Sequence, residues 1–214
     1  MIILPDGSQQ LTIMVSSTVY GNKAILKRVY DLLNSFGYKV WMSCQGTIPI
    51  NPHQSTLADC LSATENCDLF LCLITPTYGS GRDGEDASFT HQELTHAIKC
   101  NKLRWFLAHD HVVFARSLLN NLNFEGQPVR ARLQLTKKPF FEDLRILDMY
   151  DEVTDVGKPL SERKGNWVQE YATDEDVIRF VTSQFSSYQE KEIQVQETLR
   201  KKNEEQEVKE NGGL

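Results

Sequence analysis

The sequence predicts an α/β fold, in which an open five-stranded, mostly parallel sheet carries helices on both faces and a C-terminal helical extension follows. Two observations predict it. Short apolar runs rich in β-branched and aromatic residues alternate with amphipathic helical patterns over most of the chain. The run Asp68–Thr75 (Asp-Leu-Phe-Leu-Cys-Leu-Ile-Thr) shows no polar alternation, which is typical of a central parallel strand covered on both faces.

The first half of the chain supplies two strands and two helices before this central strand. In the first helix Ile25, Val29 and Leu32 recur at helical spacing, and Gly37 stands where a helix-terminating glycine belongs. The expected elements are strand Leu11–Val15, helix Asn22–Phe36, strand Tyr38–Met42 and a helix from Pro52 or His53 to Glu65.

The second half is expected to continue the alternation and to end in a capped helix. The expected elements are helix Phe89–Cys100, strand Leu103–Ala108, helix Val112–Leu122, a fifth strand at Leu144–Met149 and a long connection over Tyr150–Tyr171. Thr173 then caps a final helix whose first turn is acidic. The basic stretch between Arg130 and Lys138 is interpreted as a phosphate contact or a partner patch.

Composition limits the classes of function. The 214 residues carry a formal charge of −6, which argues against broad binding to nucleic acids or membranes. No apolar run reaches the roughly 20 residues of a membrane helix, and Met1–Gly7 lacks the pattern of a secretory signal. We therefore expect a cytoplasmic protein with reduced cysteines, consisting of an α/β domain over 1–186 and a charged, partly disordered helical tail over 187–214.

Several catalytic motifs are absent from the sequence, including the dinucleotide-binding Gly-x-Gly-x-x-Gly, the P-loop, His-Glu-x-x-His and Gly-x-Ser-x-Gly. His96 and Cys100 could share a helix face, and His109 and His111 a strand face, but neither pair has obvious further ligands in the sequence. We therefore expect no metal site and no cofactor.

A ligand site is expected where three strands end, because the crevice of such a sheet lies at the carboxyl ends of its strands. The three loops there are Ser16–Gly21, Ser43–Gln54 and Thr75–Ser88. Hydroxyls and amides near a helix N-terminus suit a ribose or phosphate, and an aromatic ring could stack on a base. Capping and loop anchoring are the ordinary alternatives. The candidate ligand-binding residues are Ser16, Ser17, Thr18, Tyr20, Tyr78, Gly79 and Ser88.

Glu93 has two interpretations. It stands three residues after Thr90, which is the spacing of a capping box. Alternatively it points into the crevice and acts on a glycosidic bond. One carboxylate can suffice there, because nicotinamide leaves NAD as a neutral base and needs no general acid.

Three motifs resemble a domain-of-unknown-function family found at the N-terminus of NACHT- or STAND-type ATPases and in bacterial defence proteins. They are Val15–Thr18, the run Asp68–Ile74 with Tyr78-Gly79, and Ser88–Leu94, within a resemblance that covers Leu11 to Met149. That family is related to TIR domains and nucleoside 2-deoxyribosyltransferases, so the resemblance implies a TIR-like, flavodoxin-like fold. It also implies that Glu93 matches the catalytic glutamate of enzymatic TIR domains, although Thr90-His91 replaces their usual Trp-Cys.

The resemblance leaves three hypotheses of function. The first is an effector of bacterial anti-phage defence that cleaves the N-glycosidic bond of NAD or a related nucleotide, with NAD as substrate. The second is a non-catalytic interaction module that associates with itself or with a separate sensor or ATPase protein. The third is a nucleoside deoxyribosyltransferase or nucleotide hydrolase.

Overall fold

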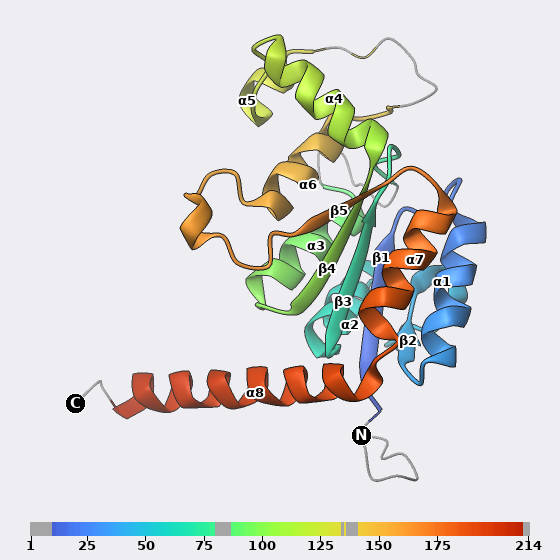
Figure 1. The fold of residues 1–214 in the computed structure, drawn as a ribbon, viewed down its shortest axis with the longest axis vertical. Coiled ribbons are helices and arrows are strands. Elements are labelled where there is room, and N and C mark those ends of the chain that lie inside the picture. Colours follow the sequence, from blue (N-terminus) through green and yellow to red (C-terminus); the bar gives the residue numbers. More distant parts are fainter. Residues whose placement is uncertain (1–9, 80–86, 134, 136–140, 212–214) are drawn as a thin grey trace.

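A computed structural model describes residues 10–79, 87–133, 135 and 141–211 of the chain. Five strands form one parallel sheet in the order β2-β1-β3-β4-β5 (Figure 1). The strands are β1 (Thr12–Ser17), β2 (Lys39–Trp41), β3 (Leu69–Ile74), β4 (Leu103–His109) and β5 (Val168–Tyr171). The predicted five-stranded α/β sheet is confirmed, and its strand order is that of flavodoxin-like folds.

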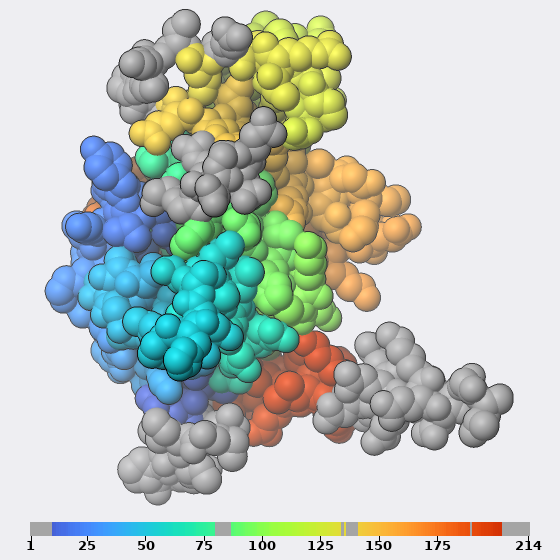
Figure 2. Space-filling view, turned by 180° about the vertical axis from the view of Figure 1, so that it is seen from behind, coloured from blue at the N-terminus to red at the C-terminus, as the bar shows by residue number. Residues whose placement is uncertain are grey.

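The sheet is covered on both faces, and β3 shows why its sequence is continuously apolar. Leu69, Leu71 and Leu73 point to one face, and Phe70, Cys72 and Ile74 to the other, all fully buried. The first face packs on two helices, α1 (Lys23–Ser35) and α7 (Asp174–Phe185). The second face, on the side of the molecule that Figure 2 shows, packs on α2 (Thr56–Asn66), α3 (Phe89–Lys99), α4 (Asp110–Asn121) and α6 (Arg145–Thr154). Short helices η1 (Ser43–Gln45), α5 (Gln127–Arg130) and η2 (Leu160–Glu162) lie in the connections.

The predicted fifth strand is wrong. Leu144–Met149 lies mostly in α6, and the fifth strand is β5, inside the segment predicted as a connection. Ile146, Met149 and Val153 are buried at i, i+3 and i+7, which is the spacing of one helix face. β5 is a four-residue edge strand with two polar residues, of which Gln169 is half-buried and Glu170 exposed, so it lacks the apolar signal of β3.

The first residue of the predicted basic stretch, Arg130, is buried and does not form part of a surface patch. Arg130 is only 2% exposed, and its guanidinium pairs with Asp148 at 3.1 Å and with Asp151 at 2.7 Å. Arg116 also pairs with Asp151. This cluster ties α4 and α5 to α6. Lys137 and Lys138 lie outside the described residues.

The C-terminal helix α8 (Tyr188–Asn211) packs across the amino-terminal edge of the sheet before it runs beyond the body of the domain (Figure 1). The Tyr188 hydroxyl accepts a hydrogen bond from the Leu11 amide at 2.6 Å. Val195 is buried in the core, and the Lys191 ammonium lies 5.1 Å from the centre of the Trp105 ring. The division at residue 186 stays a prediction, but the first half of α8 packs on the domain.

Within the described part of the chain, no helix combines the length and apolarity needed to cross a membrane.

Candidate active site at the carboxyl ends of the strands

A cavity of about 630 Å³ opens beside the carboxyl ends of β1 and β3. Chain connections leave these two neighbouring strands toward opposite sides of the sheet, which is where α/β sheets form ligand crevices. Helices α2 and α3 begin at the cavity, because their first residues, Thr56 and Phe89, are part of its wall. The described lining residues are Ser17, Thr18, Val19, Tyr20, Ser43, Thr56, Cys60, Thr77, Gly79, Phe89, Thr90, Glu93 and Glu142.

Glu93 faces the sheet from α3. Together with Thr90, Leu94 and Ala97 it forms the buried stripe of the helix, and it is only 6% exposed. Its Oε2 accepts a hydrogen bond of 2.5 Å from the hydroxyl of Ser16, near the end of β1. The side chain therefore bridges the helix and the sheet at the inner wall of the cavity.

The capping-box interpretation of Glu93 is wrong. The N-cap of α3 is Ser88, whose side chain accepts from the His91 amide, and Thr90 already lies inside the helix. The capping-box position is therefore His91, and Glu93 stands two residues further into the helix. Its burial serves the contact with Ser16 instead.

Burial raises the pKa of Glu93, because the ionised carboxylate loses its hydration. Hydrogen bonds from Ser16 and from the thiol of Cys60 act in the opposite direction, since they stabilise the charged form. Burial and the nearby Glu93 raise the pKa of the Cys60 thiol to about 12, so this thiol keeps its proton at neutral pH and donates a hydrogen bond to Glu93.

The other residues predicted from the sequence divide into two groups. Ser17, Thr18, Tyr20 and Gly79 line the cavity, and Tyr20 is 80% exposed at its mouth. Gly79 has a φ of +95°, and a Cβ built on it would lie 2.9 Å from Thr18 Oγ1, so only glycine fits this approach of the two loops.

Tyr78 and Ser88 do not line the cavity; both are fully buried behind it. The Tyr78 hydroxyl lies 2.7 Å from His91 Nδ1, and His91 Nε2 lies 3.2 Å from Glu152 on α6. The ring of Tyr78 therefore anchors the loop after β3 to α3 and α6, as the loop-anchor alternative expects.

Several lining residues were missed from the sequence. Ser43 and Thr56 belong to the second predicted loop and to the start of the helix after it, so the strand-end rule pointed to the right region without selecting them. Cys60 has only the sequence signal of an apolar core position, and in the structure it is both buried and part of the wall. Glu142, an exposed second carboxylate, gave no signal because it comes from the irregular segment before α6.

The chemistry of the cavity is that of hydroxyls and carboxylates. Ser17, Thr18, Ser43, Thr56 and Thr77 offer hydroxyl groups, while Glu93 and Glu142 are the ionisable carboxyls among the described lining residues. Hydroxyl-rich walls can bind a sugar, and the starts of two helices present backbone amides to an anion. The arrangement can therefore hold a sugar-containing ligand against a buried carboxyl group.

The fold and the cavity define a parallel α/β domain with a polar crevice at its topological switch point. The family model described as a domain of unknown function, DUF4062, matches residues 12–200, and the chain belongs to this family. The curated proteins gave no match.

Two solved structures are similar at low identity. One contains the TIR domains of the activated Roq1 resistosome that recognises the pathogen effector XopQ, with 12% identity over 57% of this chain and 75% of that chain and a TM-score of 0.41. The other is the CMP N-glycosidase BcmB of Clostridium botulinum, with 13% identity over 80% of this chain and 98% of that chain and a TM-score of 0.39. At such scores neither similarity bears on the activity of this chain.

Proposed function

We propose that the chain is an N-glycosidase that cleaves the bond between a ribose and its base in NAD or a related nucleotide, with Glu93 as the catalytic residue. The observation that carries this proposal is the buried Glu93 carboxyl group on the wall of the cavity, held by Ser16 at 2.5 Å. Ionisable side chains with perturbed pKa values in a crevice are typical of active sites.

The reaction needs few groups. When the C1′–N bond of NAD breaks, its electron pair neutralises the pyridinium, and nicotinamide leaves without a proton. The ribose becomes oxocarbenium-like, and the Glu93 carboxylate would stabilise this cation at short range. Water then bonds to C1′ and releases a proton to Glu93 or to the solvent. A transferred or cyclised product forms if another nucleophile replaces water.

The residues that line the cavity suggest how the substrate would bind. The hydroxyls of Ser17 and Thr18 lie where they could hold the ribose hydroxyls, and Tyr20 at the mouth offers an exposed ring for stacking on a base. Ser16 is a positioning residue, since its hydroxyl orients the Glu93 carboxyl group and favours its charged form. In the defence context that the resemblance implies, such an effector would deplete the NAD of an infected cell.

Product chromatography tests the proposal. Purified protein is incubated with NAD at low and high protein concentration, beside the variants Glu93→Gln and Glu142→Gln. Glu142 lines the same cavity but is exposed, so it is the matched control carboxylate. We expect nicotinamide release that Glu93→Gln lowers by at least about 100-fold, the scale of a lost catalytic group, while Glu142→Gln retains most of it. Release that persists in Glu93→Gln contradicts the assignment.

The same assay separates the related activities. A nucleoside 5′-monophosphate and free nucleosides, with and without an acceptor base, are run beside NAD. Base exchange on a free nucleoside that Glu93→Gln abolishes would identify a deoxyribosyltransferase-like reaction at the same site.

One observation favours an interaction module as a second candidate. Phe114 and Leu118 on α4 and its C-cap residue Leu122 are exposed at i, i+4 and i+8, so one side of this helix presents an apolar stripe to solvent. Light scattering over a concentration series tests for self-association through the stripe. We expect Leu118→Asp to shift any oligomer toward the monomer, and Leu160→Asp, at another exposed leucine, to leave it unchanged.

A further inference from the structure

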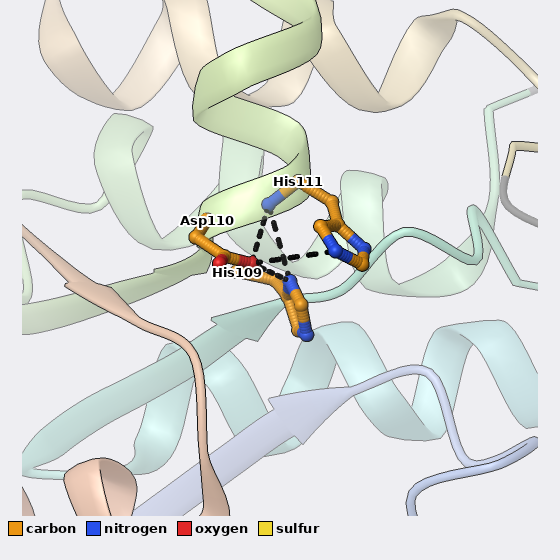
Figure 3. Close-up of side chains that lie close together, drawn as sticks. All are labelled: His109, Asp110 and His111. Atoms are coloured by element: carbon orange, nitrogen blue, oxygen red, sulfur yellow. Dashed lines mark hydrogen bonds and ion pairs between the residues drawn. The ribbon is translucent and has the colours of Figure 1, made fainter.

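Three consecutive side chains converge at the carboxyl end of β4, outside the cavity described above. His109 ends β4, and Asp110 and His111 begin α4 (Figure 3). His109 Nδ1 lies 2.6 Å from Asp110 Oδ1, and His111 Nε2 lies 3.9 Å from the same oxygen. One ligand atom from each residue falls within 4.8 Å of the other two. Two imidazoles and a carboxylate thus surround one point.

Helix capping explains only part of this cluster. The His111 amide donates to His109 Nδ1 at 3.2 Å and to Asp110 Oδ1 at 2.7 Å, so these two side chains cap the start of α4. The imidazole of His111 takes no part in either bond. It is 48% exposed, yet it turns back over the cap, with its ring 4.5 Å from that of His109. The imidazole of His111 therefore faces the same carboxylate and the same ring that cap the helix.

We propose that His109, Asp110 and His111 form a binding site for a divalent transition-metal ion such as Zn²⁺. Imidazole nitrogen and carboxylate oxygen are common zinc ligands in proteins, and three protein ligands leave further positions for water or another ligand. Ligand atoms around a tetrahedral zinc lie about 3.3 Å apart, as follows from bonds of about 2.0–2.1 Å. The observed separations of 2.6 and 3.9 Å lie on either side of this value, and all three ligand atoms lie within 4.8 Å of one another, so side-chain rotations would have to bring them to equal distances from the ion.

The surroundings allow the ion to bind without loss of the helix start. A metal on His109 Nδ1 would replace the bond from the His111 amide, but this amide keeps its shorter bond to Asp110 Oδ1 at 2.7 Å. The positive end of the helix dipole opposes a cation, and the Asp110 carboxylate supplies the compensating charge. Tyr171 packs edge-on against the His109 ring with the centroids 5.2 Å apart, which restricts its rotation.

Titration calorimetry with Zn²⁺ and visible absorption with Co²⁺ test the site on the untagged full-length chain. The variants are His111→Ala, Asp110→Asn and, as the matched control, His53→Ala, which removes another exposed histidine. We expect one equivalent of Zn²⁺ per chain, an affinity at least tenfold lower in His111→Ala and Asp110→Asn, and no change in His53→Ala. Circular dichroism confirms that each variant is folded.

The Co²⁺ spectrum gives a second readout, because visible d–d bands report the coordination of Co²⁺ by ligands of the protein. We expect these bands in the unmodified protein and in His53→Ala, and their loss in His111→Ala. Equal Zn²⁺ affinity in the unmodified protein and His111→Ala would overturn the proposal. The same is true of binding that is lost only in His53→Ala. Neither result depends on whether the protein cleaves a nucleotide.

Discussion

The hydrogen bond between Ser16 and Glu93 should be measurable in the free energy of unfolding, without any knowledge of the substrate. Ser16→Ala removes the donor of a 2.5 Å bond to a buried carboxyl group. A hydrogen bond to a charged partner contributes about 1.5–3 kcal/mol, and one between neutral groups about 0.5–1.5 kcal/mol. The cost of Ser16→Ala therefore depends on whether Glu93 is ionised.

The sign of the pH dependence follows from the burial of Glu93, which raises its pKa. As the pH rises above the ordinary glutamate pKa, the unfolded chain releases its proton before the folded protein does, so ionisation of Glu93 lowers stability over that window. Glu93→Gln removes this loss but keeps an acceptor for Ser16. We expect Glu93→Gln to match the unmodified protein near pH 4 and to exceed it in stability near pH 8.

A double-mutant cycle isolates the pair. In the unmodified background Ser16→Ala should cost about 2 kcal/mol at pH 8 and about 1 kcal/mol at pH 4. In the Glu93→Gln background it should cost about 1 kcal/mol at both values, which gives a coupling energy of about 1 kcal/mol at pH 8 only. Urea unfolding, followed by the fluorescence of the three tryptophans, supplies the free energies. Equal costs of Ser16→Ala in both backgrounds at both pH values would refute the reasoning.

Three further substitutions, measured by the same urea-unfolding assay, test a loop contact at the cavity, the Arg130 ion cluster and the packing of α8. Gly79→Ala places a Cβ 2.9 Å from Thr18 Oγ1 at a φ of +95°, so we expect a loss of about 1–3 kcal/mol. Arg130→Met leaves the partly buried Asp148 without its cation and leaves Asp151 with Arg116 alone, which should cost about 3–5 kcal/mol; a cost below about 1 kcal/mol would argue against the ion cluster. Val195→Ala should cost about 1–3 kcal/mol if α8 packs on the sheet, whereas the exposed Leu199→Ala should cost less than about 0.5 kcal/mol.

The sequence predicted the sheet well where burial leaves a periodic signal and poorly where it does not. The central strand β3 is continuously apolar because both of its faces are covered, and the apolar residues of α1 recur at helical spacing on one face. The segment Leu144–Met149 was wrongly predicted as a strand, because six residues span too few helical turns to distinguish a helix from a strand. Extended to Val153, the same pattern has helical period. The strand β5 was not predicted, because a four-residue edge strand buries little apolar surface and leaves no clear apolar pattern in the sequence.

The site shows a different limit of sequence reasoning. The strand-end rule placed Ser17, Thr18 and Gly79 at one crevice, because parallel strands end at a common edge. The contact between Ser16 and Glu93 spans 77 positions, so no local spacing encodes it. Locally, Thr90-x-x-Glu93 looks like a capping box. The structure shows that the N-cap of α3 is Ser88 and that Glu93 lies on the buried face of the helix.

Arg130 and Glu93 are both deeply buried but differ in their partners, and the difference argues for a function of Glu93. Arg130 meets two aspartates, so its burial is compensated by opposite charge. Among the described residues, Glu93 has no ion pair and is held by a hydroxyl and a thiol alone. An apolar side chain at this position of α3 would fold at lower cost, because an unpaired carboxylate is expensive to bury. Packing therefore gives no reason for a carboxyl group on the wall of an open cavity, whereas chemistry on a bound ligand does.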